Sequence, residues 1–373
     1  RPILPMTALA STPLEPSPPQ ARDVALDGAK GALIFLVVLG HTFQFAVLGR
    51  QGDPLGDGLF SAIYSFHMPA FMALAGWLAQ PGLSRGPGRW RVALRRCLSY
   101  LIPIFTVTLL TELLWSEGWP SAQWRRSLSD LFWHGLTVLW FCWAMVYGTL
   151  LMWIAESLRF RFVLSLGLLF AFMLLPAHGH WQLCQSVLPF YVLGYLVSAY
   201  REALQPCRRW QTAVGWVALL GAVVLVVGFW SRETYVYTTG IKWSGPDAHW
   251  TLLRYLAGAL GCLAFFGLWP VVFARLPGRL ARGLTGWGAS TMRTYVLQTL
   301  LFNGTAWAGL TLLMLAQAAA LKWVVALALA FGIQVLCTLA GLGLAQSPLV
   351  AGLLFGTLKG PKAGTRSASV QAQ

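Results

Sequence analysis

The sequence predicts an all-α, polytopic membrane bundle of about ten transmembrane helices, with both termini in the cytoplasm. Of its 373 residues, 57% are hydrophobic and only 10% are charged, whereas a soluble domain has about 25% charged residues. Apolar runs of about 20 residues, the length that crosses the hydrocarbon core, recur along the chain. The basic residues between these runs fall mainly on alternate sides of the predicted membrane.

Ten apolar runs give the order of the predicted helices. They cover residues 31–49, 58–79, 97–115, 136–155, 162–177, 184–200, 211–230, 251–273, 288–315 and 322–345. Pro176 and Pro189 interrupt the fifth and sixth runs, and the ninth is long enough to kink near Asn303 and Gly304. The flanking segments are predicted to be a disordered, Pro-rich N-terminal segment, 1–25, and a cytoplasmic C-terminal tail, 346–373.

The loop charges test this count of helices. With the N-terminus inside, nineteen of the 27 Lys and Arg residues lie in cytoplasmic segments, six lie in outer loops, and Arg254 and Arg293 fall within helices. One missed helix would invert every later loop and destroy this asymmetry. The positive-inside rule therefore explains the net charge of +15 better than nucleic-acid binding, because the charges are spread through short loops.

The six cysteines are predicted to be small buried hydrophobes. No two of them have the spacing of metal ligands, so no metal site is expected.

The first helix carries ionisable residues that an apolar segment seldom tolerates. Lys30 and His41 are eleven positions apart, about three whole turns, and therefore share a helix face, with Asp27 within roughly 40° of it. The rise from Lys30 to His41 is about 16 Å, from the inner interface to beyond mid-membrane. Such a stripe is costly toward lipid, so it is predicted to face the bundle interior.

The second helix places His67 at the depth of His41. His67 lies about 13 Å and His41 about 12 Å below the outer face, so two histidines on consecutive helices can meet. Histidine titrates near neutrality and serves as a general base. The alternative is that each histidine is a structural group bonded to a neighbouring carbonyl.

Basic residues crowd the inner end of the third helix, in "SRGPGRWRVALRRCLSYLIP". Arg95 and Arg96, with Lys30 at the same interface, can bind phosphates through paired donors. Coenzyme A presents such phosphates, so a cytosolic acyl-CoA would bind here. Ordinary anchoring to anionic lipid is the alternative explanation of the same charges.

Several stretches, in order, resemble the acyltransferase-3 family of integral membrane acyltransferases, and its fucose 4-O-acetylase-like branch in particular. They are "RDVALDGAKGALIFLVVLGH", "YSFHMPAFMALAGWLA", "RRCLSYLIPIF", "VLWFCWAM", "LPFYVLGYL" and "GASTMRTYVLQ". The resemblance implies an O-acyltransferase in a bacterial inner membrane. It would use acetyl-CoA or another acyl-CoA as co-substrate, with no tightly bound cofactor, and a glycan or lipid-linked sugar as acceptor.

The resemblance also implies roles for single residues. The basic residue and essential histidine of the family map onto Lys30 and His41, its aspartate onto Asp27 and its second histidine onto His67. The arginine pair falls near Arg95 and Arg96, without the Arg-x-x-Arg form. Gln298 stands where many members carry histidine.

Two hypotheses follow. The first is an O-acyltransferase in which His41 is the general base and His67 and Asp27 belong to the same catalytic group. Glu112, Arg254 and Trp243 would contact an acceptor entering over the outer loops 116–134 and 231–250, although interfacial aromatics can equally be anchors. The second is a transporter or glycan exporter that uses the buried ionisable residues as a path.

Overall fold

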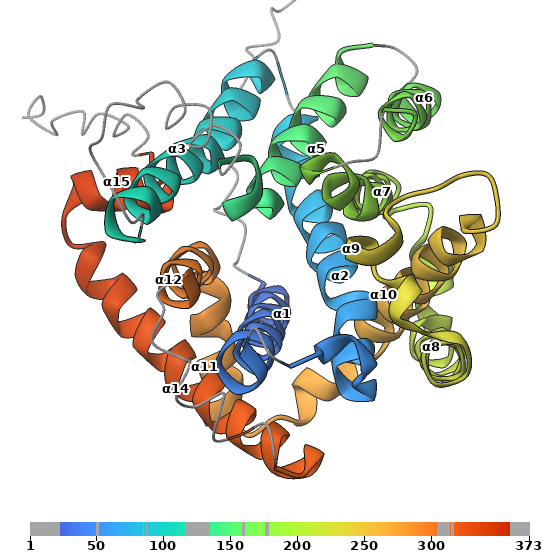
Figure 1. Cartoon of the computed structure of the whole chain (residues 1–373). Coiled ribbons are helices and arrows are strands. Elements are labelled where there is room, and N and C mark those ends of the chain that lie inside the picture. Colours follow the sequence, from blue (N-terminus) through green and yellow to red (C-terminus); the bar gives the residue numbers. More distant parts are fainter. Residues whose placement is uncertain are drawn as a thin grey trace, which may run out of the picture.

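The computed structural model describes residues 23–49, 52–84, 86, 88–115, 135–158, 161–175, 179–303, 314 and 317–358. Every regular element within these ranges is a helix, which confirms the all-α prediction (Figure 1). Seven of the described helices are long and apolar enough to cross a membrane. The chain is therefore a polytopic membrane bundle.

The helices follow the predicted order. They are α1 (Val24–His41), η1 (Thr42–Leu48), η3 (Pro54–Gly56), α2 (Gly58–Leu83), α3 (Arg89–Trp115), α5 (Trp140–Ser157), α6 (Arg161–Met173), α7 (His180–Ala199), η4 (Gln205–Trp210), α8 (Gln211–Phe229), η5 (Arg232–Thr234), α9 (Val236–Thr239), α10 (Ala248–Arg275), α11 (Gly278–Ala289), α12 (Thr291–Asn303), α14 (Ala319–Leu344) and α15 (Pro348–Phe355).

The helices that can span a membrane match seven of the ten predicted runs: α1 with η1, α2, α3, α7, η4 with α8, α10 and α14. The other three runs coincide with α5, α6 and α12, of 18, 13 and 13 residues. Pro189 lies inside α7 without ending it. The count of ten and the side of each terminus stay predictions.

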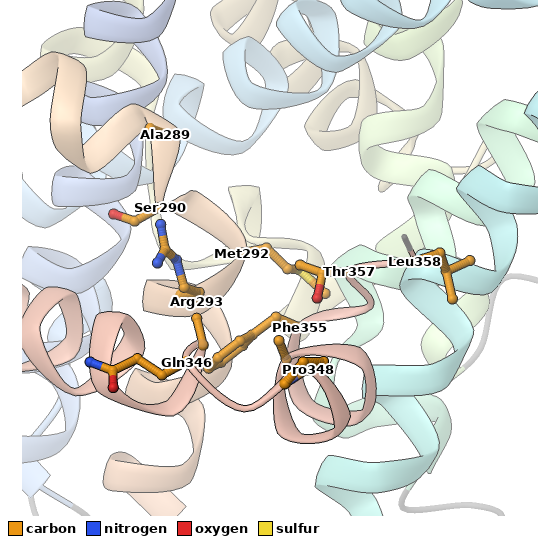
Figure 2. Close-up of a pocket in the computed structure, with 11 residues that line it drawn as sticks. Ala289, Ser290, Met292, Arg293, Gln346, Pro348, Phe355, Thr357 and Leu358 are labelled. Atoms are coloured by element: carbon orange, nitrogen blue, oxygen red, sulfur yellow. The ribbon is translucent and has the colours of Figure 1, made fainter. Parts of the chain in front are cut away.

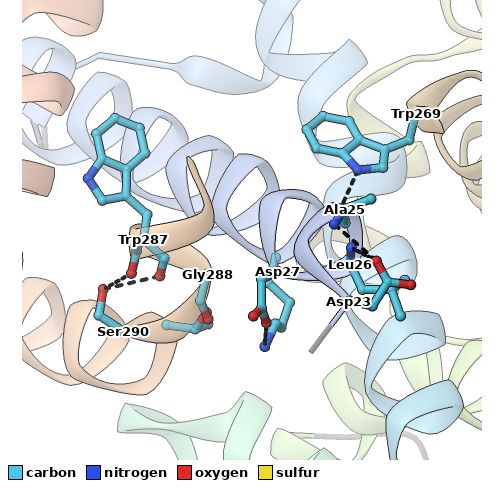
Figure 3. A network of polar contacts seen from close by, with 11 residues as sticks. Asp23, Ala25, Leu26, Asp27, Trp269, Trp287, Gly288 and Ser290 are labelled. Carbon is cyan, nitrogen blue, oxygen red and sulfur yellow. Dashed lines mark hydrogen bonds and ion pairs between the residues drawn. The ribbon is translucent and has the colours of Figure 1, made fainter. Parts of the chain in front are cut away.

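The ninth predicted run, 288–315, is not one continuous helix. The chain forms α11 and α12, which meet at Ser290 (Figure 3). Ser290 ends α11, and its carbonyl accepts the backbone N–H of Thr294 at 3.0 Å to begin α12. Its hydroxyl donates back to the Gly286 and Trp287 carbonyls at 3.2 and 3.1 Å. The break is local backbone capping, which a hydropathy pattern does not report; residues 304–313 lie outside the described chain.

The start of α1 is fixed by a cap and a tryptophan. The Asp23 carboxylate accepts the backbone N–H groups of Ala25 and Leu26 at 3.0 and 3.1 Å, the usual way to satisfy the first orphan donors of a helix. The indole N–H of Trp269 on α10 donates to the Ala25 carbonyl at 2.7 Å (Figure 3). The helix therefore begins at Val24, within the predicted N-terminal segment 1–25.

Glycines let the inner helices approach closely. A methyl group at Gly76 of α2 would overlap the Tyr191 carbonyl of α7, and one at Gly194 would overlap the Ala73 carbonyl. Helix α1 lies near the centre of the bundle, among α2, α12 and α14 (Figure 1). Backbones that approach this closely fix which helix faces meet.

Apolar side chains cover the outside of the bundle. Val217 and Val227 on α8 are 74% and 82% exposed, as expected of residues that face lipid rather than a protein core. Beyond α14, residues 348–355, part of the predicted tail, form α15, which packs on α3.

Candidate active site

His41 occupies the point where α1 changes from an α-helix to a π-helix. Residues Thr42–Leu48 form the π turns, and the Thr42 hydroxyl donates to the Val38 carbonyl at 2.7 Å. Short π segments inside helices occur frequently at functional sites. The half-buried His41 ring lies 5.6 Å from the ring of Phe45 and 6.1 Å from that of Phe302 on α12.

The His67 side chain is buried on α2, and its contacts show which ring nitrogen carries the proton. Its Nδ1 lies 2.7 Å from the Ile63 carbonyl, and a carbonyl can only accept, so Nδ1 carries the proton. The Tyr64 ring meets the imidazole edge-on, with centroids 4.8 Å apart. In the neutral ring Nε2 is therefore an acceptor.

The two histidines line the same cavity, called here the histidine cavity. Its volume is about 80 Å³, and Tyr64, Trp140, Trp230, Tyr235, Tyr237, Arg254 and Tyr295 are among its walls. That space is roughly two or three water molecules. The structure thus brings His41 and His67 together as their matched depth predicted, while their catalytic roles stay predictions.

Arg254 ties the outer loop to this cavity. It is 8% exposed, and its guanidinium donates to the Thr234 carbonyl at 2.7 Å, the Gly240 carbonyl at 2.9 Å and the Thr239 hydroxyl at 3.2 Å. The Arg254 side chain is therefore buried and bonded to the loop rather than extended toward solvent. A second contact joins the loop to α2: the hydroxyl oxygens of Tyr235 and Ser61 are 2.8 Å apart.

Of the other two predicted acceptor contacts, only Trp243 has a described side chain. Trp243 is 55% exposed and stacks on Tyr255 of α10, with centroids 5.7 Å apart, outside the walls of the histidine cavity. The side chain of Glu112, and the whole predicted outer loop 116–134, lie outside the described residues.

Asp27 lies at the Lys30 end of α1. Its carboxylate is buried and pairs with the Lys30 ammonium at 2.5 Å. The fourteen residues from Asp27 to His41 correspond to about 21 Å along the helix. The structure therefore places Asp27 beside Lys30 and not beside the two histidines with which it was predicted to act.

The arginine pair lies on the first turns of α3. Arg95 is exposed and Arg96 is half-buried. The Arg96 Nε is buried and has no hydrogen-bond partner among the described residues. A buried guanidinium N–H without an acceptor is costly, which makes Arg96 a ready donor for an anionic group.

A larger hollow, called here the Arg293 cavity, opens between α12, α14 and α15 (Figure 2). Its volume is about 490 Å³, and Arg293 and Ser290 face Gln346, Phe355 and Thr357 across it. Arg293, inside the ninth predicted run, thus contributes a cation to a cavity wall.

The Arg293 cavity lies near both predicted donor elements. Gly288, two residues before Ser290, packs against the Asp27 carbonyl of α1, and Gly356, after α15, packs against the Ser99 carbonyl of α3. Ser99 is one helical turn from Arg95 and Arg96. Lys30, Arg95 and Arg96 are not among the residues that line the Arg293 cavity; they lie on α1 and α3, whose residues Asp27 and Ser99 contact Gly288 and Gly356 next to its walls.

Helix α12 connects the two cavities. Arg293 lines the Arg293 cavity and Tyr295 lines the histidine cavity, while Phe302 contacts the His41 ring. Sequence reasoning named Gln298 only as a departure from a pattern and did not single out Tyr295. The signal available was a polar Gln three residues after Tyr295, on the same face of the helix.

Among the described residues, no group of three His, Cys, Asp or Glu side chains has the arrangement of a metal site.

Comparison with known proteins gives a consistent result. A family model described as "Acyltransferase domain" matches residues 23–340. The nodulation protein NolL of Mesorhizobium japonicum is 28% identical over 302 residues, which is 76% of this chain and 77% of the relative. The nodulation protein NolL of Sinorhizobium fredii is 26% identical over 312 residues, 80% of this chain and 84% of the relative. No solved structure matches.

The family match covers every residue that lines the histidine cavity, and Arg293 and Ser290 of the Arg293 cavity, whose other walls include residues 345–358 beyond the match. The prediction of an acyltransferase enzyme is confirmed by it, and the chain belongs to the acyltransferase-3 family of membrane acyltransferases.

Proposed function

We propose that the protein transfers an acetyl group from acetyl-CoA to a hydroxyl of a glycan or lipid-linked sugar in a bacterial inner membrane, with His41 as general base. The observation that carries this proposal is the histidine cavity, where His41 and His67 line one buried space, about 16 Å along α1 from Lys30. Helix α1 thus carries a possible base, His41, and a cation, Lys30, that are far enough apart to suit an extended thioester substrate.

In the proposed step, the acceptor oxygen attacks the thioester carbonyl while His41 takes the hydroxyl proton. The new C–O ester bond forms as the C–S bond breaks. The imidazolium of His41 then returns the proton to the departing thiolate, so the enzyme ends the cycle unchanged. The neutral His67, with its Nδ1 bonded to Ile63, can take a proton at Nε2 and serve as a relay.

The donor would bind at the Lys30 end of the bundle. Lys30, held by Asp27, together with Arg95, Arg96 and Arg293, would contact the phosphates of coenzyme A. Asp27 is thus assigned to positioning Lys30. The Arg293 cavity, at about 490 Å³, has room for part of a coenzyme, and an extended pantetheine arm would reach along α1 and α12 toward His41.

The acceptor would approach over the loop that Arg254 and Tyr235 hold above the histidine cavity. Arg254 is assigned to holding this loop, and Trp243 and Glu112 to its outer approach. The resemblance to the fucose 4-O-acetylase-like branch favours a sugar hydroxyl. The family match favours an acyltransferase over a glycan exporter.

Inverted membrane vesicles test the reaction and its direction together. Acetyl-CoA labelled in the acetyl group would be added outside vesicles of either orientation that had been loaded with p-nitrophenyl α-L-fucoside, the acceptor probe. We expect a labelled fucoside ester only where the cytoplasmic face is outward, and none from His41→Ala. Passage of the unmodified glycoside across the membrane, with no thiol release from acetyl-CoA, would support the exporter instead.

A further inference from the structure

Gln298 is a fully buried amide on α12. Its exposed fraction is 0%, and neither its side-chain oxygen nor its nitrogen has a hydrogen-bond partner among the described residues. Burying an amide without partners is unfavourable. Its presence in the middle of α12 therefore calls for a partner that the packed helices alone do not provide.

Two other glutamines of the described chain are equally buried, and both are bonded. Gln185 donates to the Phe172 and Leu175 carbonyls at 3.1 and 2.9 Å. Gln334 on α14 donates to the Thr294 hydroxyl at 3.1 Å. In both of these glutamines only the side-chain oxygen has no partner among the described residues, whereas in Gln298 neither the oxygen nor the nitrogen has one.

Gln298 lies on α12 between Tyr295, which lines the histidine cavity with His41, and Phe302, whose ring centroid is 6.1 Å from that of His41. Its amide is therefore beside the His41 imidazole. Other titratable or charged groups lining the histidine cavity with His41 are Tyr64, His67, Tyr235, Tyr237, Arg254 and Tyr295.

We propose that Gln298 is the positioning residue of His41: its amide oxygen accepts the imidazole N–H, so that the unprotonated nitrogen faces the histidine cavity. This inference rests on the proposed function, because it assigns the orientation of the proposed base. An amide can fill this role without a charge, and it fixes the tautomer in the way that a carboxylate does in other histidine-dependent enzymes.

The consequence concerns both proton states of His41. In the resting enzyme the Gln298 oxygen holds the N–H and leaves a lone pair for the acceptor hydroxyl. After proton transfer the same oxygen faces a cationic ring and stabilises it. The Gln298 side-chain nitrogen stays available to donate to an oxygen of the bound substrate. Both side-chain atoms of Gln298 would then have a hydrogen-bond partner.

Nitrogen NMR of full-length protein in lipid nanodiscs tests this proposal without depending on turnover. Histidine would be labelled with nitrogen-15, and the His41 signals assigned by their loss in His41→Gln. We expect one tautomer in the wild type and a mixture in Gln298→Leu. In Gln298→Glu, the midpoint of the His41 titration should rise by about 1–3 pH units, because a carboxylate stabilises the charged ring. Gln334→Leu is the matched control, since it removes an equally buried glutamine from a neighbouring helix.

Kinetics with acetyl-CoA and the fucoside probe give the second readout. For Gln298→Leu we expect kcat to fall roughly 10- to 100-fold, less than the loss on removing a general base, with the KM for acetyl-CoA unchanged. Unaltered His41 tautomer and midpoint in both Gln298 variants would overturn the proposal, as would the same changes in Gln334→Leu. If the wild type transferred no acetyl group, the proposed function would fail, while the NMR result would still decide whether Gln298 orients His41.

Discussion

The two cavities of this protein share helix α12 and differ in almost everything else. The histidine cavity is about 80 Å³, with aromatic walls, and the Arg293 cavity is about 490 Å³. Arg293 of α12 lines one and Tyr295 of α12 lines the other. Helix α1 lines the histidine cavity with His41, and its Asp27 lies against Gly288 of α11, close to the other cavity. We propose that one region binds the donor and the other carries out the reaction.

The difference follows from what each end is proposed to do. A general base works best where water is excluded and its neighbours are fixed. Cations that recruit a phosphate group need access to solvent, because a fully buried charge costs too much without a partner. A variant of His41 tests the reaction end, a variant of Arg293 tests the binding end, and variants of Arg254 and Trp243 test the predicted outer loop.

His41→Ala should have the largest effect. Removal of the proposed base is expected to lower acetyl transfer by 10²–10⁴-fold, the usual contribution of such a group, with the KM for acetyl-CoA little changed. Initial rates with purified protein would measure it. His249→Ala, which removes an exposed histidine in the first turn of α10, is the control, and equal rates for the two variants would remove His41 from the mechanism.

Arg293→Gln should act at the binding end instead. Loss of one charged hydrogen bond to a phosphate is expected to raise the KM for acetyl-CoA roughly 10- to 100-fold, while kcat stays near the wild-type value. Arg282→Gln, an exposed arginine on α11, should change neither constant. A fall in kcat without a change in KM would show that the two cavities do not divide binding from reaction.

Arg254→Lys should separate the acceptor from the donor. Lysine keeps the charge but cannot make the three bonds that hold the loop, so the KM for the fucoside is expected to rise about 10-fold. Thiol release from acetyl-CoA without acceptor should persist. Lys242→Ala, which breaks an exposed loop ion pair, is the comparison. Loss of both activities together would mean that the loop shapes the whole histidine cavity.

Trp243→Ala should have the smallest effect. Its ring is exposed and stacks on Tyr255, and such a pair is worth about 0.5–1.5 kcal/mol. The KM for the fucoside should therefore change by roughly 2- to 10-fold or less, and the donor constants should not move. A larger change than in Arg254→Lys would place the sugar on the outer loop surface rather than in the histidine cavity.

The sequence alone determined the all-α membrane bundle, the order of its helices and the shared face of Lys30 and His41. These properties are local, because hydropathy and the helical period act within single segments. It also placed His41 and His67 at one depth, and the structure brings both to one cavity.

Only the tertiary structure decided which faces meet. It turned Arg254 toward the loop carbonyls and placed Arg293 and Tyr295, two residues apart on α12, in the walls of two different cavities. The physical reason is that close backbone contacts, such as Gly288 against Asp27 and Gly76 against Tyr191, fix the rotation of each helix. Those contacts join residues far apart in the chain, and no periodic pattern within one helix specifies its partner.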